Sequence, residues 1–217
     1  MSFGQLVIQG IWETLYMTLV STVFAYIIGI PIAVVLSTSR PGGINPRPVL
    51  YPILSFIVNI MRSVPFLILL VAIFPLTRFI AGTIIGATAT IVPLTIAAAP
   101  FVARLVEGSL NEVDAGVVEA AQSMGASHFQ IVTKVLIPEA KPSLITNAAV
   151  ATITILGYSA LAGFTGGGGL GDLAVRYGYY KFDSVHMWEI VLIIVVIVQL
   201  MQEIGTRLSR KTDKRVK

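Results

Sequence analysis

Residue types that perform covalent catalysis are scarce in this chain, and their spacing does not bring them together. Its two histidines are His128 and His186, and Ser159 stands in Gly-Tyr-Ser-Ala rather than in a Gly-x-Ser-Gly sequence. A serine nucleophile needs a base within hydrogen-bonding reach. His128 falls in a polar connection and His186 near the outer edge of the last apolar stretch, so we expect neither to reach Ser159. The pattern argues against a serine hydrolase.

Acid-pair, metal and nucleotide chemistry also lack their characteristic residues. The carboxylates Glu13, Asp172, Asp183 and Glu189 fall near one side of the apolar stretches without forming a paired acid motif. The absence of cysteine excludes disulfides and thiolate metal sites. A phosphate-binding loop needs Gly-x-x-x-x-Gly-Lys-Ser/Thr, and residues 165–169 hold glycines without that Gly-Lys. We therefore expect no catalytic residue, no metal site and no cofactor in this chain.

The composition is that of a membrane protein. The chain is 55% hydrophobic and 12% charged, with a mean hydropathy of +0.86, whereas a soluble domain carries about 25% charged residues. A bilayer-spanning helix needs roughly 20 mostly apolar residues. The stretches that qualify are residues 14–36, 51–74, 79–102, 144–164 and 187–204. The sequence predicts an all-α integral membrane protein with five transmembrane helices, the second kinked or broken at Pro65.

Basic residues indicate the orientation of the spans, because cytoplasmic loops carry an excess of lysine and arginine. Five spans put the two termini on opposite sides of the membrane. The basic residues on or near the C-terminal side are Arg40, Arg47, Arg62, Arg104, Lys134, Lys141, Arg207, Arg210, Lys211, Lys214, Arg215 and Lys217. Only Arg78, Arg176 and Lys181 fall on the other side. We predict that the N-terminus, which lacks a cleavable signal, is outside and that the C-terminus is cytoplasmic.

Three further expectations concern these charges. The basic tail of residues 207–217 is predicted to orient the chain and to contact anionic lipid, rather than to bind nucleic acid. Arg62 and Arg104 are placed near the cytoplasmic ends of their spans, from which their long side chains can reach the interface. Glu107 stands three residues after Arg104 and can pair with it on one helix face.

The polar segment of residues 119–138, between the third and fourth spans, must leave the hydrocarbon. Asp114 is suited to cap a short helix ahead of it, and Gly125 to end that helix in a left-handed conformation. Ser127 and Gln130 match a capping box that opens a second helix. Pro138 disfavours helical geometry at the residue before it and predicts a break there. The segment is therefore predicted to be helix, sharp turn and helix.

This segment has two possible roles. As a binding element it would lay a helix into a groove of a partner. The small residues Ala120 and Ala121 would permit close approach, and Glu119 would offer a carboxylate to a partner Arg or Lys. The alternative is an ordinary amphipathic connector between two spans.

The pattern Glu119, Ala120, Ala121, Gly125 and Pro138 resembles the cytoplasmic coupling loop of binding-protein-dependent ABC importer permeases. In that family the loop is where the membrane subunit meets its ATPase. The chain departs mildly from the family pattern before the proline, where Val135 and Ile137 replace the usual Ile and Leu. Residues 62–70, 91–107 and 157–179 resemble the methionine-importer branch, and the similarity covers residues 11–207.

This resemblance implies the type I ABC importer permease fold, with residues 12–206 as the transport domain. It further implies a homodimer in a bacterial cytoplasmic membrane, two copies of an ATPase, and a substrate-binding protein or lipoprotein outside. The implied function is import of D- or L-methionine by alternating access, with ATP hydrolysis on the partner. A permease for another small amino acid or related solute remains an alternative. A secondary transporter is less well supported, because the sequence shows neither inverted repeats nor ion-coupling groups at mid-membrane depth.

The fourth span carries the candidate gate. Its polar and small residues can serve helix packing and interhelical hydrogen bonds or can line a pore. Because the family's pore lies along this span, we take Tyr158, Ser159, Ala160 and Leu161 as the candidate translocation pathway, with Leu161 as the bulkiest aliphatic side chain there. The glycines of residues 165–169 are either a flexible connector or a segment that moves with the gate or docks the binding protein.

Overall fold

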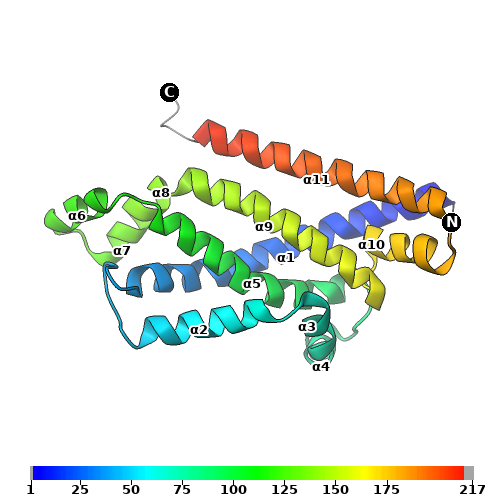
Figure 1. Cartoon of the computed structure of the whole chain (residues 1–217), viewed down its shortest axis with the longest axis horizontal. Coiled ribbons are helices and arrows are strands. Elements are labelled where there is room, and N and C mark those ends of the chain that lie inside the picture. The colour runs from blue at the N-terminus through cyan, green and yellow to red at the C-terminus, as the bar shows by residue number, and fades with distance from the viewer. Residues whose placement is uncertain (1, 213–217) are drawn as a thin grey trace.

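The computed structural model describes residues 2–212, and within that range the chain forms helices only (Figure 1). The last five residues of the predicted basic tail lie outside the described residues. The α-helices are α1 (Phe3–Ser39), α2 (Leu50–Ser63), α3 (Phe66–Ala72), α4 (Phe74–Ala81), α5 (Ala87–Asn111), α6 (Ala115–Ser123), α7 (His128–Ile131), α8 (Ile137–Glu139), α9 (Lys141–Ala162), α10 (Gly169–Ala174) and α11 (Ser184–Thr212).

The predicted fold class is confirmed, with one span taking an unexpected form. In the described chain, α1, α5, α9 and α11 are each long and apolar enough to cross a membrane. The remaining span is the pair α2 and α3, which meet at an angle of 97°. Pro65 stands in this break as the residue before α3. Its missing N–H and fixed φ angle end one helical piece and begin the next, as the sequence predicted.

The third predicted span, residues 79–102, begins before the helix that forms it, which is α5. Phe79 belongs to the separate short helix α4, which ends at Gly82 with φ of 75°. A loop then leads to Gly86, whose φ is 94°, and only after it does α5 begin. Hydropathy does not register this interruption because the loop is itself apolar, whereas the positive φ angles at two glycines let the chain turn. At its other end α5 runs on to Asn111 and keeps both of its prolines inside the helix.

The core of the bundle is the contact between α1 and α5, which run side by side. Small residues let the two backbones approach, as is common between membrane helices. Gly29 of α1 has no room for a side chain, since a Cβ atom there would lie 2.8 Å from Cγ1 of Val102. α9 and α11 make a similar approach at Gly205, where a Cβ atom would clash with that of Ala149.

The bundle has two distinct ends (Figure 1). One end, here called the α6 end, carries α6, α7 and α8 beside the end of α1 and the start of α2. The opposite end, called the α10 end, carries the N-terminus, α10 and the start of α11. The described chain therefore starts at the α10 end and finishes with α11 directed toward the α6 end, as an odd number of crossings requires.

Candidate coupling segment and translocation pathway

The first half of the candidate coupling segment is a helix fixed at both ends by local hydrogen bonds. Asp114 caps α6, because its carboxylate accepts a bond of 2.8 Å from the Gly116 amide. At the other end Gly125 has φ of 77°, and the Ala126 amide donates to the Ala121 carbonyl at 3.1 Å. This is the left-handed stop that the sequence predicted. It turns the chain sharply from α6 toward α7.

The second half begins as predicted but ends differently. The capping box is present, with the Gln130 amide donating to Ser127 Oγ and the Ser127 amide donating to Gln130 Oε1 at 2.8 Å. The predicted break before Pro138 was wrong, because Ile137 is helical, with φ of −64° and ψ of −46°. The turn of residues Val132–Leu136 widens into a π-helix instead. A wider turn relieves the clash between a proline ring and the carbonyl four residues earlier, so the helix continues through Pro138.

Only part of the segment is available to a partner. Ala121 is buried at 5% exposure against the chain's own core, so its small side chain serves internal packing, while Ala120 is exposed. The exposed apolar residues of the two helices include Val117, Met124 and Phe129, the last two at 82% and 77% exposure. Large apolar side chains exposed on a surface outside the hydrocarbon are typical of a protein interface.

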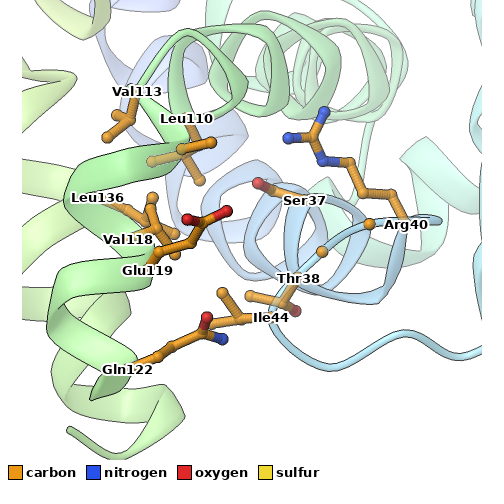
Figure 2. Close-up of a pocket in the computed structure, with 13 residues that line it drawn as sticks. Ser37, Thr38, Arg40, Ile44, Leu110, Val113, Val118, Glu119, Gln122 and Leu136 are labelled. Carbon is orange, nitrogen blue, oxygen red and sulfur yellow. The ribbon is translucent and has the colours of Figure 1, made fainter. Parts of the chain in front are cut away.

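Glu119 points into a cavity of about 160 Å³ between α6 and the end of α1 (Figure 2). Ser37 and Arg40 line the α1 side of this cavity, and Ser37 is held by a hydrogen bond of 2.7 Å to Asn111. Among residues 2–212 the Glu119 carboxylate has no hydrogen-bond or ion-pair partner. Nε of Arg40 is buried and also lacks a partner in that range. The cavity is thus lined by two opposite charges that have no partner within residues 2–212.

The four candidate gate residues form one helical turn and face different surroundings. Tyr158 is half-buried and stacks on Phe66 of α3, with ring centroids 4.8 Å apart and planes within 5°. Ser159 is fully buried and donates at 2.7 Å to the Leu156 carbonyl of its own helix. Ala160 packs against α10, whereas Leu161 is 42% exposed. Of the four residues only Ser159 is fully buried, while Tyr158 and Ala160 are partly exposed and Leu161 is exposed.

The glycine-rich run ends in a turn that is hydrogen-bonded to α1. Glu13 Oε2 of α1 accepts a hydrogen bond of 2.7 Å from the Gly169 amide, and Thr14 Oγ1 accepts one of 2.9 Å from the Leu170 amide. Gln9 holds the other carboxylate oxygen of Glu13 at 2.7 Å. The start of α10 is thereby bound to α1. Sequence reasoning missed this role of Glu13, because no local pattern connects residues so distant in the chain.

Arg104 joins two spans, and the expectation that it reaches the interface was wrong. The predicted pair with Glu107 is confirmed at 2.6 Å, and the two side chains are only 17% and 7% exposed. The guanidinium also donates to Ser55 of α2 and, at 2.9 Å, to Asn59. Through Nη1 and Nη2 this mostly buried cation forms a structural tie between α5 and α2, although its Nε has no partner among residues 2–212.

Arg62 lies deeper than predicted. It stands in the last turn of α2, directly before the break. The helix from Leu50 to Arg62 is ~18 Å long at ~1.5 Å of rise per residue, which reaches about halfway across a hydrocarbon core of ~30 Å. Arg62 is exposed, and it is the twelfth of the 24 residues 51–74, so it stands midway along the predicted span rather than near its cytoplasmic end.

A helical membrane bundle with a capped, partly exposed helix pair at one end is the architecture of an importer permease. The family of the binding-protein-dependent transport system inner membrane component matches residues 25–217, and this chain belongs to that family. The chain is 49% identical to the probable D-methionine transport system permease protein MetI of Vibrio cholerae, over 98% of its own length and 94% of that protein. It is 53% identical to the D-methionine transport system permease protein MetI of Escherichia coli K12, over 73% of each chain.

Solved structures agree with the sequence relatives. A chain of the MetNI methionine ABC transporter, in an inward-facing conformation, superposes with a TM-score of 0.96 at 48% identity, over 97% of both chains. An amino acid ABC transporter solved with histidines gives a TM-score of 0.79 at 22% identity, which supports the fold alone. The type I ABC importer permease fold expected from the sequence is therefore confirmed.

Proposed function

We propose that this chain is the membrane-spanning subunit of an ATP-driven importer for methionine, in the D or L form. The observation that carries the proposal is the match along the whole chain to the MetNI methionine ABC transporter, at 48% identity and a TM-score of 0.96. The relatives named as D-methionine permeases support the same substrate. The chain itself acts as a non-catalytic subunit, and ATP is bound and hydrolysed by a separate ATPase.

The ATPase docks on α6 and α7 in this proposal. The exposed apolar side chains Met124 and Phe129 supply buried area, and Ala120 lets the partner surface come close. Glu119 offers its unpaired carboxylate to an Arg or Lys that enters the cavity beside α6. Gly125 fixes the angle between the two helices, and Pro138, in α8 directly after the widened turn, carries the motion into α9.

The transporter works as a homodimer with two ATPase copies, by alternating access. ATP binding draws the ATPase subunits together, and with them the α6–α7 pair of each permease copy. Because each pair packs into the core of its bundle through Ala121 and Ile131, the two bundles rock as rigid bodies about the two-fold axis. The α6 end closes, the α10 end opens, and hydrolysis resets the inward-facing state. Tyr158 and Leu161 line the pathway that this motion opens, while Ser159 and Ala160 hold the packing behind them.

The chain is placed in a bacterial cytoplasmic membrane, with the α6 end in the cytoplasm and the α10 end outside. Residues 12–206 form the transport domain, and the basic residues 207–217 contact anionic lipid. A substrate-binding protein or lipoprotein docks at the α10 end. Exposed aromatic side chains are available there, including Tyr179, Tyr180 and Phe182 at 65%, 67% and 83% exposure.

The test is uptake of labelled L-methionine into proteoliposomes that contain this chain, its ATPase and its binding protein, challenged with unlabelled amino acids. We expect ATP-dependent uptake that methionine, including the D form, blocks best. If uptake required ATP but a different amino acid blocked it best, the chain would still be an ATP-driven permease, and methionine would be rejected as its substrate.

A further inference from the structure

A second cavity, of about 220 Å³, lies beside the break between α2 and α3 and away from the coupling segment. Its walls come from three parts of the fold. The break contributes Arg62 and Phe66, α5 contributes Ala97 and Phe101, and α9 contributes Tyr158. The cavity is thus next to Tyr158, one of the candidate gate residues. A cation and three aromatic rings line it.

Arg62 is an exposed cation that stands midway along the predicted span of residues 51–74. In the described part of the chain its guanidinium has no hydrogen-bond or ion-pair partner. Arg104, by contrast, is matched by Glu107, Ser55 and Asn59 of its own chain. A charged side chain at this depth is costly, so those that occur pair with another group or mark a substrate pathway. The fold provides a partner for Arg104 and leaves Arg62 open toward a cavity.

The lining matches the parts of an apolar amino acid. A guanidinium presents a planar fork of donors that binds a carboxylate in a two-point contact. The faces of Phe101 and Tyr158 suit an ammonium group by cation–π attraction. Sulfur of a thioether packs favourably against aromatic rings. The stacked rings of Tyr158 and Phe66 form one wall of the cavity. A cavity below the roughly 300–1,000 Å³ typical of drug-sized ligands suits a single amino acid.

We propose that this cavity is a substrate site within the permease, in which Arg62 binds the α-carboxylate of methionine and the rings of Phe66, Phe101 and Tyr158 hold its side chain. The inference rests on the proposed function and deepens it. It gives the permease a selective contact of its own, in addition to that of the binding protein. A substrate without a carboxylate would lack the contact with Arg62, which is the main contact of the proposed site.

The experiment uses a methionine analogue with a photoreactive diazirine in its side chain, added to the assembled permease–ATPase complex in lipid nanodiscs. Labelled positions are located by mass spectrometry. We expect labelling near Phe66 and Tyr158 that unlabelled methionine prevents and methioninol, which lacks the carboxylate, does not. Arg62→Gln should reduce this labelling at least tenfold, and Arg62→Lys should reduce it less.

The matched control is Arg78→Gln, because Arg78 is an exposed arginine of α4 outside the cavity; it should label like the unmodified complex. Ala97→Leu keeps Arg62 but fills the cavity, and should also abolish labelling. The proposed site would be rejected if the wild-type complex were not labelled in α3 and α9. It would also be rejected if Arg62→Gln were labelled as strongly as the wild type. The same preparations are tested for ATP-dependent methionine uptake. Absence of uptake by the unmodified transporter would instead reject the proposed function.

Discussion

Replacing Gly125 by alanine isolates the contribution of one backbone conformation to the coupling segment. Gly125 has φ of 77°, and a Cβ atom built there meets nothing within 4 Å. The substitution therefore introduces no clash, and its whole cost is that of holding an L-residue in the left-handed region. That cost is ~1–2 kcal/mol per residue. A free-energy change of this size alters the ratio of closed to open turn by a factor of ~5–30.

The control is Gly157→Ala. A Cβ atom at Gly157 also meets nothing within 4 Å, but this glycine lies inside α9 with no positive φ angle. Alanine there should be neutral or stabilising by up to ~1 kcal/mol, because glycine is the weaker helix former. Gly125→Asn should fall between, since asparagine tolerates the left-handed region better than alanine does.

Amide hydrogen exchange of α6 in the reconstituted transporter, read together with methionine uptake per ATP hydrolysed, measures the effect. We expect Gly125→Ala to speed amide exchange in the last turn of α6, next to Gly125, by ~5–30-fold. We also expect it to lower methionine uptake per ATP hydrolysed. Gly157→Ala should leave both unchanged. If Gly125→Ala matched Gly157→Ala in both measurements, the turn at Gly125 would not set the geometry of coupling.

Three further substitutions test other contacts. Glu119→Lys should lower methionine uptake below about a tenth while ATP hydrolysis persists, because two cations would then meet in the docking cavity; Glu112→Lys, on an exposed residue, is its control. Glu107→Ala should destabilise the permease by ~3–5 kcal/mol, since it leaves the half-buried Arg104 without its carboxylate, and thermal unfolding in detergent should register a lower Tm. Glu13→Gln replaces a charge-assisted bond to the glycine-rich turn by a neutral one and should cost ~1–2 kcal/mol; faster proteolysis between α9 and α10 would report it.

The features predictable from the sequence are those that short stretches of chain decide. Span number follows from runs of apolar residues, and the break at Pro65 from the chemistry of proline. The capped helices around Gly125 follow from hydrogen bonds that join residues a few positions apart. The Arg104–Glu107 pair is of the same kind, since helix periodicity puts both on one face.

Two of the features that were missed depend on tertiary contacts. The bond from Glu13 to Gly169 joins residues with no local relation in the sequence. The burial of Ala121 depends on which face of α6 meets the bundle, and the Glu-Ala-Ala pattern does not encode that choice. Arg62 was misplaced near a span end because of its charge, although the predicted span of residues 51–74 already puts it at the middle.

The central claim is that this permease moves its substrate only when a separate ATPase drives it through α6 and α7. The most direct test compares methionine uptake by proteoliposomes holding the chain alone with uptake by those holding chain, ATPase and binding protein, each with and without ATP. The account predicts uptake only in the complete set with ATP, and its loss in Glu119→Lys. Uptake by the chain alone, or uptake that ignores ATP, would contradict it.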